Sequence, residues 1–247
     1  MSLKSICSFM IFGLLSASKS QAKNYDSYQF DPEKIIEATA AFVKETLQGE
    51  GTGHDWRHAE RVWKMALHIG KEEKADLFII QLGALLHDIA DWKFCGGDDT
   101  VGPAKARAFL ETQFIPEHIT QHVTHIIKNV SFKGLQTPIA NQLTLEGKIV
   151  QDADRLDALG AIGIARTFAY GGHTKRELYN PDIKPEIHTS YEQYKKNSGP
   201  TINHFYEKLL HLKDLMNTQT ARNIAKTRHQ YMKEFLAQFY QEVDGIL

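Results

Sequence analysis

Apolar residues recur every three to four positions over almost the whole chain, the spacing that places them on one face of an α-helix. Between residues 179 and 200 several Pro and Gly residues instead indicate a loop. We find neither repeats nor convincing strands. The pattern therefore predicts one all-α domain over residues 25–247, with helices over residues 32–47, 55–69, 74–89, 103–110, 116–130, 147–170, 202–216 and 220–243.

The predicted helix over residues 74–89 is apolar on almost every side, so it belongs in the centre of the domain. It ends with Leu85-Leu86 followed by the polar pair His87-Asp88. An ionised Asp in apolar surroundings is costly unless it is paired or bound to a metal. The pair alone is a weak signal, because such dipeptides also occur by chance and can cap a helix.

Two other predicted helices carry residues of the same chemical kind. His58 lies four residues before Val62, close to the apolar stripe of its helix, and Asp154 lies inside the apolar helix over residues 147–170. Asp154 shares its face with Val150 and with three small residues, Ala158, Ala161 and Ala165. Asp152 is the alternative carboxylate, but residues two apart on a helix point to opposite sides, which favours Asp154.

These side chains offer two imidazoles and two carboxylates but no thiolate. Such mixed nitrogen and oxygen ligands suit manganese, magnesium, iron or cobalt better than a structural zinc. The segment 116–130 carries a further row of polar residues, His118, His122, His125 and Asn129, beside its apolar face. This row indicates either a second metal or an ordinary polar helix face. Because polar faces are the commoner case, we expect one metal.

Composition and charge exclude some classes of protein. The 42% of apolar and 24% of charged residues are ordinary globular values. A formal net charge of −1 argues against a general nucleic-acid surface but allows a local basic pocket for a small anion. Cys7 and Cys95 have no metal-ligand spacing and are best explained as two unrelated thiols.

Residues 1–22 differ from the rest of the chain. Lys4 precedes an apolar run over residues 6–15, and small residues follow up to Ala22. This is the layout of a secretory signal, and the run is too short for a stable membrane span. The alternative is an N-terminal helix that packs on the domain.

With these motifs in view, the chain resembles the HD superfamily of metal-dependent phosphohydrolases, whose signature is His, then His-Asp, then a distant Asp. It is most similar to a bacterial branch of HD-domain nucleoside triphosphate pyrophosphohydrolases. The resemblance covers nearly the whole domain in order, and its carriers are GHDW (53–56), His58 with Arg61-Val62, ALLHDIAD (84–91), QDADRLDALG (151–160), ARTFAYGG (165–172) and HFYEKLL (204–210). The N-terminal extension is a departure, because members of this branch are usually cytosolic.

The resemblance implies a single HD-type helical domain with a divalent metal, Mn2+ first and Mg2+, Co2+ or Fe2+ as alternatives, between its central helices. It implies metal ligands at His58, His87, Asp88 and Asp154, and an acidic residue that assists the attacking water at Asp91. The expected reaction is attack of a metal-bound water on the α-phosphorus of a (deoxy)nucleoside triphosphate, releasing pyrophosphate. Such a polyanion needs cationic and hydrogen-bonding partners. The candidates for substrate binding are Arg61, His125, Asn129, Lys133, Asp157 and Lys208.

Other functions remain open at this stage. The same metal site fits a nucleotidase, a cyclic-nucleotide phosphodiesterase or an alarmone hydrolase, and a non-catalytic nucleotide-binding module is a third class. The expected partner is a small nucleotide and not a nucleic acid, and assembly into a homo-oligomer stays open. The family predicts a cytoplasmic location, whereas residues 1–22 predict export.

Overall fold

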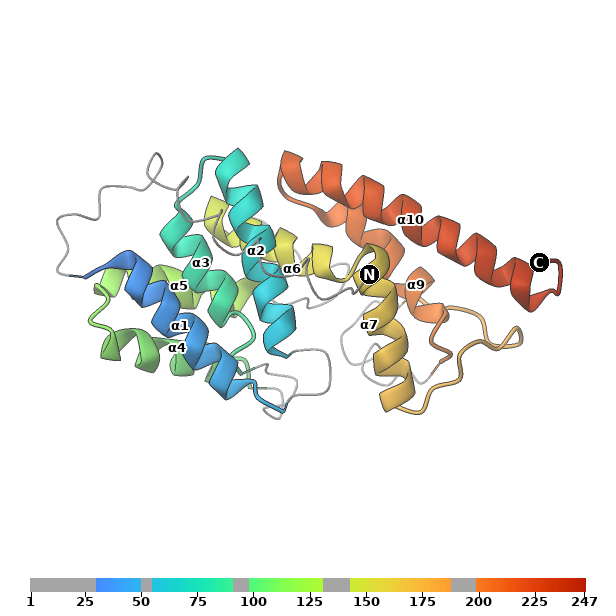
Figure 1. The fold of residues 1–247 in the computed structure, drawn as a ribbon, viewed down its shortest axis with the longest axis horizontal. Helices are drawn as coiled ribbons and strands as arrows, with labels where there is room; N and C mark the ends of the chain where they lie inside the picture. Colours follow the sequence, from blue (N-terminus) through green and yellow to red (C-terminus); the bar gives the residue numbers. More distant parts are fainter. Residues whose placement is uncertain (1–29, 50–54, 91–97, 131–142, 188–198) are drawn as a thin grey trace, which may run out of the picture.

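The computed structural model describes residues 30–49, 55–90, 98–130, 143–187 and 199–247. These residues form helices and connecting turns without a strand, which confirms the predicted fold class (Figure 1). Residues 1–22, both cysteines, Asp91 and Lys133 lie outside the described residues. The elements are α1 (Pro32–Thr46), α2 (Trp56–Glu72), α3 (Leu77–Leu86), α4 (Val101–Thr112), α5 (Glu117–Val130), α6 (Leu145–Asp157), α7 (Gly160–His173), α9 (Asn203–Glu207), the 3-10 helix η1 (Leu209–Leu215) and α10 (Gln219–Val243).

Helix α3 is the centre of the first group of helices, as its apolar sequence predicts. It packs against α1, α2, α5 and α6, and its residues are buried except Leu77 and Gln81. Gln81 faces α2, where its side-chain oxygen accepts a hydrogen bond from Trp63 Nε1 at 3.1 Å. Burying an apolar helix on all sides removes a large hydrocarbon surface from water, which stabilises this group. The turn after α3 is therefore held in the middle of the protein.

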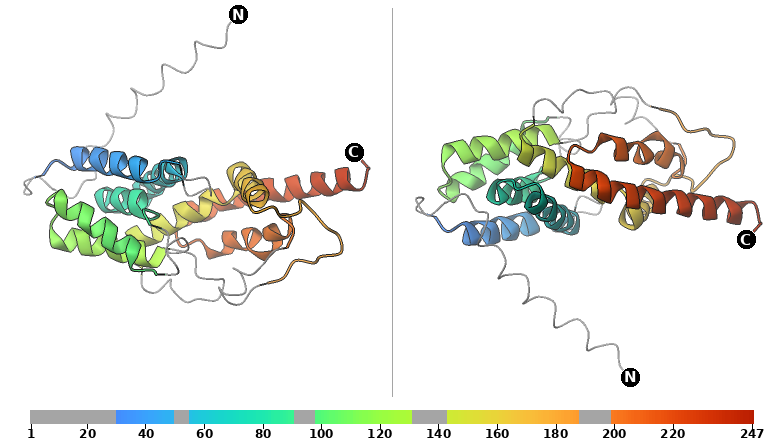
Figure 2. Two further views of the ribbon diagram at one scale, coloured as in Figure 1. Left: turned by 90° about the horizontal axis from the view of Figure 1, so that it is seen from below. Right: turned by 90° about the horizontal axis from the view of Figure 1, so that it is seen from above.

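A second group of helices packs around aromatic rings. Helices α7 and α10 lie against one another, and α10 also covers η1 and part of α6. Phe205 of α9 is fully buried, with its ring centroid 5.9 Å from that of Phe235 and 6.0 Å from that of Phe168. Figures 1 and 2 show that α6 runs between the two groups. Side chains of α6 can thus contact both.

Helix α3 begins at Leu77, three residues later than the predicted start. Lys74 has a left-handed backbone conformation with φ of 56°, which ends the preceding helix, and Asp76 then caps α3 by accepting hydrogen bonds from the backbone N–H groups of Phe78 and Ile79. The predicted end at Ile89 is also wrong. Leu86 is the last residue of α3, so His87 and Asp88 lie in the turn that follows.

The predicted helix over residues 147–170 is two helices, α6 and α7. The chain bends after Asp157, and Gly160 starts α7 with φ of 72°, a conformation that glycine adopts without strain. Ala161 and Ala165 therefore lie on α7 and not on the Asp154 face of α6. The predicted stop at Gly171-Gly172 is also wrong, because α7 continues to His173.

The predicted helix over residues 202–216 is also interrupted. Lys208 has φ of −142° and ψ of −57°, which separates α9 from the 3-10 helix η1. The imidazole of His211 hydrogen-bonds to the backbone carbonyl of Tyr206 at 2.8 Å, so a side chain occupies an acceptor beside the break. None of the described helices is both long enough and apolar enough to cross a membrane.

Candidate metal centre

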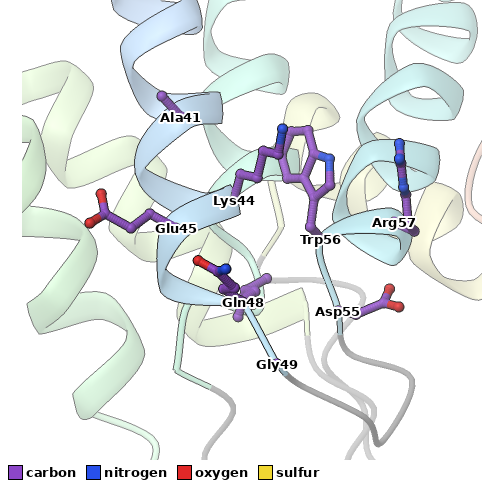
Figure 3. Close-up of a pocket in the computed structure, with 9 residues that line it drawn as sticks. Ala41, Lys44, Glu45, Gln48, Gly49, Asp55, Trp56 and Arg57 are labelled. Atoms are coloured by element: carbon purple, nitrogen blue, oxygen red, sulfur yellow. The ribbon is translucent and has the colours of Figure 1, made fainter.

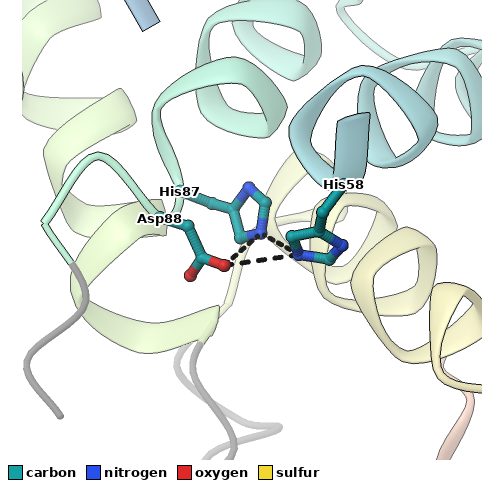
Figure 4. Close-up of side chains that lie close together, drawn as sticks. All are labelled: His58, His87 and Asp88. Atoms are coloured by element: carbon teal, nitrogen blue, oxygen red, sulfur yellow. Dashed lines mark hydrogen bonds and ion pairs between the residues drawn. The ribbon is translucent and has the colours of Figure 1, made fainter. Parts of the chain in front are cut away.

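Four ligand-type side chains reach one point from three elements. His58 lies in the first turn of α2, where Asp55 caps the helix by accepting a hydrogen bond from the His58 backbone N–H at 2.9 Å. His87 and Asp88 follow α3, and Asp154 comes from α6. Figure 4 shows the first three converging. The cluster is therefore positioned by the N-terminal cap of α2, by the buried end of α3 and by the face of α6 that carries Asp154.

The ligand atoms of this cluster lie within a few ångströms of one another. His58 Nε2 is 3.3 Å from His87 Nε2, 3.3 Å from Asp88 Oδ2 and 3.4 Å from Asp154 Oδ1. His87 Nε2 is 3.4 Å from the same Asp88 oxygen and 3.8 Å from the Asp154 oxygen. His58, His87 and Asp88 are buried, whereas 28% of the Asp154 side chain is exposed. Solvent therefore reaches the cluster beside Asp154.

The two imidazoles are held so that each presents Nε2 to the cluster. The other nitrogen of His87, Nδ1, lies 2.8 Å from the backbone carbonyl of Ala84, which can only accept a hydrogen bond. In His58 the Nδ1 atom lies 2.7 Å from Asp157 Oδ2. These partners assign the ring proton to Nδ1 in the neutral form of both residues, leaving both Nε2 lone pairs for a cation.

The electrostatics of the cluster favour a positive charge at its centre. Burial opposes a charged His58, but hydrogen bonds to Asp154, Asp157 and Asp88 outweigh it and raise the pKa of His58 to about 10. The pKa of His87 is also raised: burial disfavours its charged form, and the Asp88 carboxylate overcomes this. Burial disfavours an ionised Asp154 too, yet the hydrogen bond from His58 and the nearby His87 hold its pKa below the usual range. A carboxylate that stays ionised beside two imidazoles suits a divalent cation.

Asp157 is the centre of an adjoining group of charges. Arg61 donates to it twice, from Nε to Oδ1 at 2.7 Å and from a terminal nitrogen to Oδ2 at 3.0 Å, and Arg166 donates to Oδ2 at 2.7 Å. Burial tends to raise the pKa of Asp157, but the hydrogen bonds from His58 and Arg61 lower it to about 2. The Asp157 carboxylate therefore carries a full negative charge between two guanidinium groups.

Arg166 was not singled out from the sequence. On one continuous helix a residue nine positions after Asp157 would lie about 13 Å further along the axis, out of contact. The bend at Gly160 removes that separation. The available signal was the glycine itself, placed between two apolar helical stretches and followed by an arginine.

Asp152 has different partners from Asp154. Its carboxylate accepts four hydrogen bonds of 2.8–2.9 Å from the backbone N–H and side-chain groups of Asn217 and Thr218, at the start of α10. It is fully buried on the side of α6 that faces away from the imidazoles. The structure therefore places Asp154, and not Asp152, beside His58 and His87.

The other predicted substrate residues in the described part of the chain come from α5 and from the position after α9. His125 is exposed on α5, and Asn129 donates a hydrogen bond to its carbonyl at 2.8 Å. Lys208 follows α9 in the second group of helices. His122, in the same polar row as His125, lies 2.8 Å from Thr144 Oγ1. In the described part of the chain, the ligand atoms of His58, His87 and Asp88 all lie within 4.8 Å of one another, and Asp154 Oδ1 lies within 3.8 Å of both imidazoles.

A pocket of about 570 Å³ lies between the end of α1 and the start of α2 (Figure 3). Trp56 and Lys44 stand side by side in it, and its cations, Lys44 and Arg57, are balanced by Glu45 and Asp55. Trp56 and His58 are two residues apart on α2, so they leave the helix on opposite sides. This pocket is therefore separate from the ligand cluster.

A helical bundle with buried imidazoles and carboxylates at its centre defines a class of all-helical proteins with a candidate metal centre. The HD domain matches residues 55–159, which contain all four ligand-type residues. Bacillus subtilis (strain 168) has a relative, YpgQ, that is 39% identical over 215 residues, covering 86% of this chain and 96% of the relative. The chain therefore belongs to the HD superfamily of hydrolases, which places it among the metal-dependent phosphohydrolases.

Solved structures agree with this assignment. An HD-superfamily hydrolase from Bacillus thuringiensis is 45% identical and superimposes with a TM-score of 0.69, covering 87% of this chain and 99% of that one. The crystal structure of Bacillus subtilis YpgQ in complex with ADP is 37% identical, with a TM-score of 0.68 and coverage of 85% and 96%. Both likenesses extend well beyond the HD domain, into the second group of helices.

Proposed function

We propose that this protein hydrolyses (deoxy)nucleoside triphosphates to the monophosphate and pyrophosphate. The observation that carries the proposal is the convergence of two imidazoles and two carboxylates at a point that is open beside Asp154 and flanked by Arg61 and Arg166. The relative YpgQ crystallised with ADP. This supports a nucleotide ligand for the present protein as well. Deoxynucleotides and pyrophosphate release rest on the resemblance to the pyrophosphohydrolase branch.

His58, His87, Asp88 and Asp154 would hold the divalent metal, with Mn2+ as our first choice. Such an ion lowers the pKa of water towards neutrality and offsets charge on phosphate oxygens. Asp88 and Asp154 together neutralise a divalent cation, and the two positive charges of Arg61 and Arg166 exceed the one negative charge of Asp157. Arg61 and Arg166 therefore bring one positive charge in excess of Asp157 to the edge of the site, which suits an anionic substrate.

The remaining roles are proposed from sequence and position. Asp91, outside the described residues, would accept a proton from the attacking water. His125, Asn129, Lys133 and Lys208 would contact the phosphates or the sugar. We also keep a cytoplasmic site of action as the family expectation, with the sequence of the mature amino terminus as the test of export through residues 1–22.

The test is a nucleotide screen with the full chain and added Mn2+, with Mg2+, Co2+ and Fe2+ in parallel and chromatographic identification of products. We expect a nucleoside monophosphate and pyrophosphate in equal amounts. His87→Ala and Asp154→Ala should abolish turnover. Full activity in both variants would exclude the proposed centre.

The products also separate the alternatives. Orthophosphate would indicate a nucleotidase, and opening of a cyclic nucleotide would indicate a phosphodiesterase. Pyrophosphate from a nucleotide that carries it on the 3′ position would indicate an alarmone hydrolase. If the metal-loaded protein binds nucleotides and hydrolyses none, it is a binding module.

A further inference from the structure

We propose that Asp157 is a positioning residue for the metal centre, fixed by Arg61 from α2 and by Arg166 from α7, and that it acts through His58. The inference rests on the metal-binding part of the proposed function and is independent of the substrate. It begins with a difference between the two imidazoles. His87 Nδ1 faces a backbone carbonyl, that of Ala84, whereas His58 Nδ1 faces a side chain. A side chain keeps an imidazole fixed only if it is itself fixed.

The Asp157 carboxylate is fixed by donors from two directions. Its Oδ1 accepts from Arg61 Nε at 2.7 Å, and its Oδ2 lies within 3.0 Å of nitrogen atoms of His58, Arg61 and Arg166. Only 5% of the Asp157 side chain is exposed. Rotation of this carboxylate would break charge-assisted hydrogen bonds in a buried place, so its orientation is set by its partners.

The orientation of Asp157 determines which nitrogen of His58 faces the cluster. A carboxylate 2.7 Å from Nδ1 favours the proton on that atom, which leaves the Nε2 lone pair pointing at Asp88 and Asp154. Hydrogen bonds of this kind to a ligating histidine orient the ring and raise its basicity. Asp157 therefore acts on the centre through His58, whose Nε2 faces the other ligand atoms.

Arg166 extends this arrangement to the second group of helices. It lies on α7, which packs against α10, whereas His58 and Arg61 lie on α2 in the first group. Asp157 is the last residue of α6, so the hydrogen bond from Arg166 crosses the bend at Gly160. The position of α7 thereby affects the orientation of His58. Arg166 is a positioning residue through the same carboxylate.

The experiment is a titration of the full chain with Mn2+, read from the electron paramagnetic resonance signal of free Mn2+. The variants are Asp157→Asn and Arg166→Gln. Arg176→Gln is the matched control, because Arg176 follows α7 and lies 5.8 Å from the ring of Tyr170, not on Asp157. Thermal unfolding of each metal-free protein checks that it is folded.

We expect the Mn2+ dissociation constant of Asp157→Asn to rise about 10–100-fold, that of Arg166→Gln to rise less, and that of Arg176→Gln to stay unchanged. At saturating Mn2+ both Asp157→Asn and Arg166→Gln should bind as much Mn2+ as the wild-type protein. Should Asp157→Asn not fold, Arg166→Gln carries the same test, because it removes one of the groups that fix the carboxylate.

Unchanged Mn2+ affinity in Asp157→Asn would overturn the inference. A raised KM with unchanged Mn2+ affinity in Arg166→Gln would assign Arg166 to the substrate and overturn its positioning role. Failure of the proposed function is distinguishable, because the wild-type protein would then bind no Mn2+ or would bind it without hydrolysing any nucleotide.

Discussion

Asp152 and Asp154 lie two residues apart on α6, and their carboxylates face different regions of the molecule. On one side of the helix Asp152 is fully buried and accepts four hydrogen bonds from Asn217 and Thr218. On the other side Asp154 points its Oδ1 at the Nε2 atoms of His58 and His87 and keeps 28% of its side chain exposed. The same chemical group thus meets backbone and side-chain donors of α10 on one face and metal-ligand nitrogens on the other.

The contrast shows how a structural carboxylate differs from a ligand carboxylate. Asp152 has its acceptor capacity filled by hydrogen bonds, so it has little left to offer a cation. Asp154 faces nitrogen atoms that can each present a lone pair, an arrangement that becomes favourable when a cation is shared among them. Burial alone would have ranked the two residues wrongly, since Asp152 is the more buried.

The largest expected effect is that of Asp154→Ala on catalysis. Loss of a direct ligand should reduce kcat/KM by more than the roughly 100-fold that loss of an outer-shell partner can produce. The free energy of unfolding of the metal-free protein should fall by about 2 kcal/mol, because the buried His58 loses a charged hydrogen-bond partner. Steady-state kinetics and urea unfolding in the presence of chelator measure the two quantities. Wild-type kinetics would remove Asp154 from the ligand set.

Asp152→Ala should give the opposite result. Four donors at the start of α10 would lose their acceptor, so we expect the free energy of unfolding to fall by about 3 kcal/mol. Mn2+ affinity should stay within about threefold of wild type while the protein is folded, a change worth less than 1 kcal/mol. Asp152→Asn, which keeps one carbonyl acceptor, should be destabilised less. If Asp152→Ala were as stable as wild type but lost Mn2+, the roles of the two faces would be exchanged.

Much of the fold could be predicted from sequence because the burial of apolar residues at helical spacing determines most of it. The apolar residues of α3 predict a central helix, and α1, α2, α5 and α10 follow their helical periodicity to within a few residues. The predictions were wrong where local backbone geometry overrides periodicity. Gly160 with φ of 72° and Lys208 with φ of −142° each break a stretch that reads as one helix.

The candidate site, too, could be predicted except where it depends on local backbone geometry. His58, His87 and Asp88 could be grouped because each is a polar residue in an apolar setting, and helix geometry favoured Asp154. Arg166 was missed, because its contact with Asp157 depends on the bend between α6 and α7, which helical periodicity does not predict. The positions of Asp91 and Lys133, outside the described residues, stay predictions from sequence.

A smaller effect on Mn2+ binding is expected from pH. It concerns the side of α6 that carries Asp154 and not the side that carries Asp152. Without metal, the carboxylates raise the pKa of His58 from 6.5 to about 10, so at pH 7 a cation must displace a proton from this histidine. Raising the pH from 7 to 9 should therefore strengthen Mn2+ binding by up to about tenfold per unit, or 1.4 kcal/mol.

The linked effect on stability has the opposite sign. A raised pKa in the folded state stabilises the metal-free protein fully below pH 6.5, and this contribution is lost as the pH rises towards 10. Mn2+ should thus raise the Tm by a larger increment at pH 8.5 than at pH 7, as differential scanning calorimetry can measure. Asp154→Ala should weaken this trend and Asp152→Asn should not. An increment independent of pH would contradict proton competition.

The smallest expected effect is that of Gly160→Ala. It tests whether the bend after α6 contributes only to packing, as Asp152 does, or also to metal binding, as Asp154 does. At φ of 72° an alanine costs about 1–2 kcal/mol, and its Cβ would lie 3.1 Å from Arg228 Cγ. Gly172→Ala in α7 is the matched control: its Cβ meets nothing within 4 Å, so stability should be unchanged or slightly higher. Because the bend brings Arg166 to Asp157, Gly160→Ala should also weaken Mn2+ binding a few-fold, whereas Gly172→Ala should not. Reduced stability with wild-type Mn2+ affinity would show that the bend, like Asp152, stabilises the fold without contributing to metal binding.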